Sequence, residues 1–181
     1  GAGHGAWIDK HDFVLRVNYA PLRGFERDVG ARTTARIMQM DTFSNDAQYR
    51  AVLRGDERDY GGVPRLVSCH RPFQGRCTAL RLAQVFANHS LGTAHLLSMD
   101  VSRRCRRRFD ALGAAHRSRR QRSVTSGMLA IEVALSVASC RTIRLFGFAD
   151  GTSPLQCYHY YGNLKDGSCK FTEGHFFNPS M

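Results

Sequence analysis

The fold is indicated most clearly by residues 125–148, which read TSGMLAIEVALSVASCRTIRLFGF. Thr125, Ser126 and Gly127 can cap and open a helix, and apolar residues then recur at helical spacing as far as residue 138. Residues 142–148 follow closely and are rich in β-branched and aromatic residues, which predicts a buried strand. A helix followed directly by a strand is a repeating unit of α/β folds.

Further elements are expected upstream of this unit. Residues 13–17, 63–68 and 94–99 are short apolar runs typical of strands, and residues 77–88 have helical spacing. Residues 33–60 have a weaker, mixed polar pattern. Alternating strands and helices predict one α/β domain over residues 1–181, with a mainly parallel Rossmann-type sheet flanked by helices. Ligands of such sheets bind beyond the carboxyl ends of the strands, where Asn18 and residues 147–151 fall.

Composition restricts the partners without choosing one. The 181 residues carry a net charge of +11, which favours a polyanion, an acidic membrane surface or an anionic sugar nucleotide. Nine arginines lie within residues 103–122, where we expect the solvated face of a helix and a linker. The sequence contains no apolar run of bilayer-spanning length and no signal peptide at its start, so we expect any membrane anchor to lie outside this chain.

Residues 8–34 carry the first of four motif matches. They contain IDKHDFVLRVNYAP and GFERDVGARTT, which resemble the second half of the large motif of the sialyltransferases, glycosyltransferase family 29. Arg32 replaces the family's lysine. The resemblance implies a GT-A-like fold and assigns Asn18 to the donor nucleotide, because an amide both donates and accepts hydrogen bonds. The alternative is a structural asparagine in a turn. We expect four residues of this stretch to form a local polar and salt-bridge network with one another: Asp9, His11, Asp12 and Arg16.

The second match covers VTSGML at residues 124–129, Cys140, and RLFGF at residues 144–148, which resemble the small sialyl motif. The family more often has proline in place of Val124. A helix N-terminus offers N–H donors and partial positive charge to a phosphate or carboxylate. An ordinary N-cap is the alternative. The resemblance assigns donor binding to Thr125, Ser126, Gly127 and Gly147.

The third and fourth matches supply two histidines. The sequence CYHYY at residues 157–161 resembles the family's short H-Y-Y motif, and His175 falls where its very small motif has a histidine. The resemblance implies that His175 is the general base for the acceptor hydroxyl and that His159 stabilises the departing phosphate. Imidazole suits both roles, because its ordinary pKa of about 6.5 leaves it largely neutral but basic. The family has an acid five positions after the later histidine, where this chain has Ser180.

The cysteines leave alternatives open. The resemblance implies a disulfide between Cys157 and Cys169, and it pairs Cys140 with a cysteine that would precede the first residue. A zinc site at Cys157, His159, Cys169 and His175 is the rival interpretation, although its spacing matches no common zinc motif. Three more cysteines have no assigned partner, Cys69, Cys77 and Cys105.

The resemblance therefore implies a truncated catalytic domain that transfers sialic acid from CMP-sialic acid, with inversion, to a glycan hydroxyl on a glycoprotein or glycolipid. It further implies no cofactor or metal, no nucleic-acid partner, and a type II membrane protein on the lumenal side of the Golgi. Two other classes stay open. One is an inactive CMP or glycan binder, suggested by the absent first half of the large motif. The other is a basic nucleic-acid-binding module, although Phe109 is the only aromatic residue in the arginine-rich segment.

Overall fold

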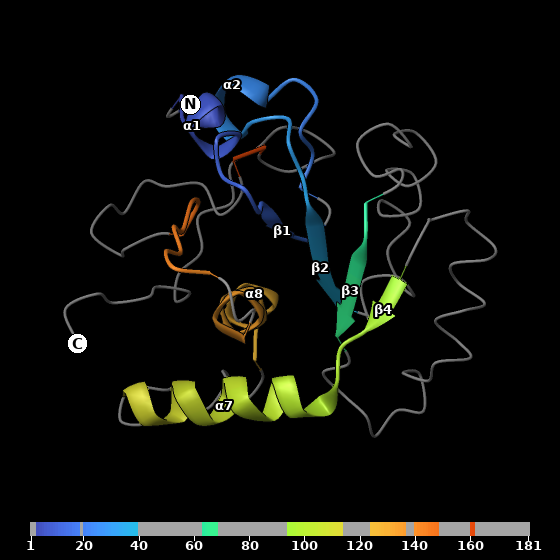
Figure 1. The fold of residues 1–181 in the computed structure, drawn as a ribbon, viewed down its shortest axis with the longest axis vertical. Coiled ribbons are helices and arrows are strands. Elements are labelled where there is room, and N and C mark those ends of the chain that lie inside the picture. The colour runs from blue at the N-terminus through green and yellow to red at the C-terminus, as the bar shows by residue number, and fades with distance from the viewer. Residues whose placement is uncertain are drawn as a thin grey trace.

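A four-stranded parallel sheet forms the centre of the molecule (Figure 1). The computed structural model describes residues 3–18, 20–39, 63–68, 94–113, 124–136, 140–148 and 160–161. The strands, in the spatial order β1-β2-β3-β4, are β1 Leu15–Val17, β2 Ala35–Gln39, β3 Arg65–Ser68 and β4 Ala94–Leu96. The parallel sheet and its flanking helices confirm the expected α/β class, consistent with a GT-A-like fold.

Two pairs of helices flank this sheet. Helices α1 Gly5–Ile8 and α2 Glu26–Val29 pack together above one end of the strands (Figure 1). Helix α8 Ser126–Ser136 packs on β1 and β2, and helix α7 Met99–Gly113 packs on α8. The predicted helix over residues 77–88 lies outside the described residues.

The hydrophobic core joins α8 to the sheet and to α7. Leu129, Ala130 and Val133 of α8 are buried in one cluster with Ile37 of β2 and Cys105 of α7. Full burial of a leucine side chain stabilises a fold by about 1.5–3 kcal/mol, so α8 is held mainly by this face. The core role predicted for the apolar face of this helix is confirmed.

The strand predictions are right in three places and wrong in two. The runs at residues 13–17, 63–68 and 94–99 contain β1, β3 and β4. The mixed pattern of residues 33–60 conceals β2, because the fully buried Arg36 interrupts its apolar residues. The strand expected at residues 142–148 is not formed.

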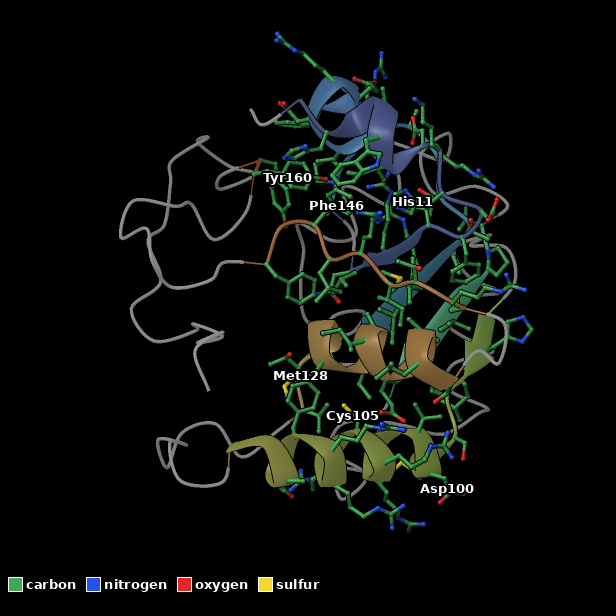
Figure 2. All side chains as sticks on the ribbon, turned by 60° about the vertical axis from the view of Figure 1, so that its left-hand side comes forward. His11, Asp100, Cys105, Met128, Phe146 and Tyr160 are labelled. Carbon is green, nitrogen blue, oxygen red and sulfur yellow. The ribbon has the colours of Figure 1, made fainter. Side chains whose placement is uncertain are left out.

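Ring contacts explain the irregular backbone of residues 142–148. The Phe146 ring meets the Trp7 ring edge to face, with 5.3 Å between centroids, and Arg144 lies over the Trp7 ring at 5.0 Å. Phe146 also contacts His11 edge to face at 5.9 Å (Figure 2). Phe146 and Arg144 of this segment therefore contact Trp7 of α1 and the neighbouring His11 in place of forming a β-ladder.

The first part of the arginine-rich segment forms α7, and residues 114–122 lie outside the described residues. Arg103 is exposed as expected and pairs with Asp100 at 3.1 Å. Arg104 and Arg108 instead reach Glu132 of α8, with Nε atoms 3.4 Å and 2.9 Å from its two carboxylate oxygens. The pair between Arg108 and Glu132 Oε2 is an ion pair without a hydrogen bond, since the geometry of these atoms does not meet hydrogen-bond criteria. The solvated face predicted for this arginine-rich segment therefore covers only part of the surface of α7.

Cys105 lies on the face of α7 that packs against α8 (Figure 2). Burial, and then the charge of Glu132, raise the pKa of its thiol to about 11. The thiol is therefore protonated at neutral pH and acts as a small apolar core group.

The ion pairs between α7 and α8 predict an asymmetric effect on stability. Glu132 is 1% exposed, whereas the side chains of Arg104 and Arg108 are 44% and 56% exposed. The double variant Arg104→Ala/Arg108→Ala leaves a buried carboxylate without its cations and should lower the free energy of unfolding by about 3 kcal/mol at neutral pH. Glu132→Gln leaves arginines that water can solvate and should cost only about 1 kcal/mol.

Urea denaturation of the variants measures this asymmetry. Arg103→Ala/Arg107→Ala is the matched control, since both side chains are exposed, and it should change stability by no more than about 0.5 kcal/mol. Equal losses for Glu132→Gln and the Arg104→Ala/Arg108→Ala variant would contradict the assigned ion pairs.

Candidate functional site

Asn18 directly follows β1 and has a left-handed backbone with a φ of +54°. Its N–H donates to the Ile37 carbonyl at 2.8 Å, and its own carbonyl accepts a bond from Arg36 at 2.8 Å. The side-chain Oδ1 is buried and has no hydrogen-bond partner in the part of the chain that the structure describes. A buried acceptor left unpaired costs about 1–3 kcal/mol, which makes this atom a candidate for contact with a bound hydrogen-bond donor.

The N-terminus of α8 provides the second unpaired group. Thr125 caps the helix as predicted, because its Oγ1 accepts the N–H of Met128 at 3.2 Å. The hydroxyl of Ser126, the first helical residue, is buried and lacks a partner among the described residues. Since the first N–H groups of a helix point outward and carry partial positive charge, this end suits an anion with oxygen acceptors.

Gly127 and Gly147 bring the 140–148 segment against this helix end. A Cβ on Gly127 would lie 3.2 Å from Cε1 of Phe148, so the absence of a side chain admits the ring. Gly147 has a φ of +76°, a conformation that glycine adopts at no steric cost. The two halves of the small-motif match therefore meet at the start of α8.

The core places the two motif regions side by side. Val17, which precedes Asn18, and Met128, which follows Gly127, pack against the same buried cluster. Helix α8 also packs directly on β1. The helix that begins at Ser126 therefore covers the strand that ends at Val17, directly before Asn18.

Arg16 organises the loop between α2 and β2. Its guanidinium donates to the carbonyls of Val29 at 2.7 Å and Arg32 at 2.8 Å, and to the Thr33 hydroxyl at 3.0 Å. Burial lowers the pKa of Arg16 from its ordinary value, and the nearby charge of Arg36 acts in the same direction. These bonds support a structural role for Arg16.

The other members of the predicted polar network also bind backbone. The Asp9 carboxylate accepts the N–H groups of residues 31 and 32, each at 2.9 Å. Arg32 donates to the carbonyl of Asp12 at 2.9 Å, and Nδ1 of His11 lies 3.0 Å from a carbonyl of α1. The polar network is confirmed. Most of the hydrogen bonds described for it run to main-chain groups, one runs to the Thr33 hydroxyl, and none of those described is a salt bridge.

Tyr160 anchors the H-Y-Y segment beside the first strand. Its hydroxyl donates to the carbonyl of Pro21, in the loop that follows Asn18. Its ring lies edge to face against Phe25 and Tyr161, with centroid distances of 5.2 Å and 5.1 Å. The residue next to His159 in the sequence is therefore fixed on the loop beside Asn18.

Several predicted residues lie outside the described part of the chain. They are His159, His175, Cys157 and Cys169. Within the described ranges there is no cluster of potential metal ligands, and no helix is long and apolar enough to cross a bilayer. Cys140 is exposed and free, and Cys105 is buried and free.

Sequence reasoning missed three residues that shape the site. Arg36 reads as a polar break in a weak pattern, yet it lies at the centre of the sheet and binds the Asn18 carbonyl. Phe148 was assigned to a strand, and the role in the H-Y-Y segment went to the histidine rather than to Tyr160. The glycine at position 127, which leaves room for a ring, was the available signal for Phe148.

Comparisons with known proteins agree with the motif matches. The family model described as Glycosyltransferase family 29 (sialyltransferase) matches residues 1–179. "Sialyltransferase-like protein 2" of Oryza sativa subsp. indica is 30% identical over 190 residues, covering 91% of this chain and 45% of that protein.

Animal relatives match over shorter stretches. "CMP-N-acetylneuraminate-beta-galactosamide-alpha-2,3-sialyltransferase 2" of Mus musculus is 47% identical over 45 residues, 25% of this chain and 13% of that protein. The corresponding "sialyltransferase 1" of Sus scrofa is 51% identical over 50 residues, 28% and 15% of the two chains. The matches span less than half the length of each of these relatives. Because the family model covers nearly all of its residues, the chain belongs to glycosyltransferase family 29, the sialyltransferases.

Proposed function

We propose that this protein transfers sialic acid from CMP-sialic acid to a hydroxyl of a glycan on a glycoprotein or glycolipid. The observation that carries the proposal is a pair of buried polar atoms, Asn18 Oδ1 and Ser126 Oγ, without partners in the described residues. Asn18 directly follows a strand and Ser126 begins a helix, and this strand and helix pack together in a chain of the sialyltransferase family. The mouse relative's name includes CMP-N-acetylneuraminate, which supports the choice of donor.

The two unpaired groups suit different parts of the donor. The Asn18 amide can bind a nucleotide by accepting at Oδ1 and donating from its nitrogen. The Ser126 hydroxyl and the N-terminal N–H groups of α8 can donate to phosphate or carboxylate oxygens. Gly127 and Gly147 let the backbone and the Phe148 ring approach this end of the helix. We therefore assign donor binding to these residues together with Thr125, which caps the helix.

The proposed reaction is a direct displacement with inversion. His175 accepts the proton of the acceptor hydroxyl as its oxygen attacks the anomeric carbon of sialic acid. The bond from that carbon to the phosphate oxygen breaks, and its electron pair leaves with CMP. His159 donates a hydrogen bond to the phosphate as its charge grows. Tyr160, held on Pro21, supports this role by fixing the chain next to His159.

The remaining family features belong to the same proposal. A disulfide between Cys157 and Cys169 would close a short loop around His159 and stabilise it by about 2–3 kcal/mol in the chain-entropy model. The chemistry needs no metal, because the histidines supply the proton acceptor and the charge stabilisation. We place the protein on the lumenal side of the Golgi, where a type II anchor would hold it.

The test measures binding and transfer separately. CMP and single-stranded DNA are titrated against the protein, and transfer from labelled CMP-sialic acid is followed over a panel of galactose- and galactosamine-terminated acceptors. Saturable CMP binding with transfer to at least one acceptor supports the proposal.

Two results would overturn it. CMP binding without transfer to any acceptor would indicate a non-catalytic binder of the same fold. Salt-sensitive DNA binding that CMP does not compete would indicate a nucleic-acid-binding module, because phosphate contacts release counterions and weaken as salt rises.

A further inference from the structure

Arg36 is an unusual residue for the middle of a sheet. It lies on β2 and is 0% exposed. Its register partners in the parallel sheet are Arg16 of β1 and Arg65 of β3, and like charges placed opposite each other are unfavourable. Burying a guanidinium costs several kcal/mol unless its donors are satisfied. Because burying Arg36 costs free energy, we expect its side chain to perform a function at this position.

The contacts of Arg36 lead to the loop at the end of β1. Its Nη1 donates to the Asn18 carbonyl at 2.8 Å, and Nη1 and Nη2 both lie 3.3 Å from the Ala20 carbonyl. One planar guanidinium therefore bridges two carbonyls that flank the turn of the chain. A lysine ammonium lacks the fixed fork that such bridging uses.

Two neighbouring residues of β2 hold Asn18 from both sides. The carbonyl of Ile37 accepts the Asn18 N–H at 2.8 Å, while Arg36 binds the Asn18 carbonyl. The left-handed φ of +54° is uncommon for a non-glycine residue and persists where its surroundings fix it. Both main-chain groups of Asn18 are thus bound to β2, which fixes the backbone that carries Oδ1, an atom without a partner among the described residues.

We propose that Arg36 is a positioning residue that preorganises Asn18 for the donor nucleotide by bridging the Asn18 and Ala20 carbonyls. The inference rests on the proposed function for the identity of the ligand. Arg36 acts through the backbone of Asn18 and is not assigned any contact with the nucleotide. Preorganisation raises affinity because the ordering cost is met before the ligand binds.

A double-mutant cycle tests this coupling. Arg36→Lys keeps the charge and loses the fork, and Asn18→Gly removes the side chain while tolerating the positive φ. Arg36→Lys alone should raise the Kd for CMP by about tenfold. This is the change in affinity expected when the free energy of about one hydrogen bond that orders Asn18 is lost. In the Asn18→Gly background it should raise the Kd by less than about twofold, because the group being positioned is gone. Equal effects in both backgrounds would overturn the proposal.

A measurement without ligand separates this inference from the proposed function. The Asn18 amide hydrogen should exchange about tenfold faster in Arg36→Lys than in the unsubstituted protein, because one of the two ties on Asn18 is weakened. Unchanged exchange would overturn the positioning role whether or not the protein binds CMP. Failure of the unsubstituted protein to bind CMP would instead refute the proposed function.

Two further variants complete the design. Arg23→Lys makes the same substitution at an exposed position of the loop beyond Ala20 and should leave the Kd and the exchange rate unchanged. Arg36→Gln removes the buried charge but keeps an amide donor, and it replaces Arg36→Lys if thermal unfolding shows that the lysine variant does not fold. Its expected Kd and exchange effects have the same direction.

Discussion

Replacing His175 with alanine should lower the rate constant of sialic acid transfer by about 100- to 10,000-fold, the usual contribution of a positioned general base. CMP binding should remain nearly unchanged, because the groups assigned to donor binding lie at the end of β1, at the start of α8 and at Gly147, and His175 is not among them. The measurement is single-turnover transfer from labelled CMP-sialic acid, with CMP titration on the same preparation. Equal transfer rates in the two proteins would rule out the role assigned to His175.

The pH dependence of the transfer rate distinguishes a general base at His175 from a residue with only a structural role. In the unsubstituted protein the rate should fall on the acid side as the base becomes protonated and can no longer accept the acceptor's proton. In His175→Ala that acid limb should disappear, since no titrating base remains at the position. His95→Ala is the matched control, because His95 is exposed on β4, at the sheet edge opposite β1. Its rate and pH profile should match those of the unsubstituted protein.

Replacing Asn18 with aspartate should raise the Kd for CMP by about 100-fold, because like charges brought together cost several kcal/mol. Asn18→Gly should raise it by about tenfold, since it removes the amide without adding charge. Both residues tolerate the φ of +54°, so neither change forces the backbone to move. Isothermal titration with CMP gives both values.

Unfolding measurements separate binding from folding in these variants. Asn18→Gly removes a buried acceptor without a partner among the described residues, which offsets the entropic cost of glycine, so its stability should change by less than about 1 kcal/mol. Unaltered CMP affinity in Asn18→Asp would remove Asn18 from the donor site. A large loss of stability with unaltered affinity would favour the structural asparagine in a turn.

Apolar patterning predicted the elements in which apolar residues dominate the sequence, although Ser68 of β3 and Glu132 of α8 are also buried. It located β1, β3, β4 and the core face of α8. It missed β2 because a single arginine contributes to the sheet through carbonyl bonds that no hydropathy pattern reveals. It mistook residues 142–148 for a strand because ring contacts with Trp7 select the same residue types as a β-ladder.

The candidate site was predictable to the extent that local chemistry defines it. The Thr125 cap follows from hydroxyls and glycine before an apolar helix, and Asn18 from its place after a strand. The bond from Tyr160 to Pro21 depends on how distant segments meet, and no local pattern encodes that. The contact of Phe148 with Gly127 became apparent only once the two segments were placed together.

The Tyr160 to Pro21 bond also bears on the order of folding. The two residues are 139 positions apart in the sequence, and α8 is almost as distant from the strand it covers. Contacts of such separation carry a large loop-closure cost and arise late, whereas the pairing of β1 with β2 joins near neighbours. During synthesis the loop after Asn18 emerges long before Tyr160 does. The proposed donor site should therefore be completed late in folding, after the last of these segments has docked.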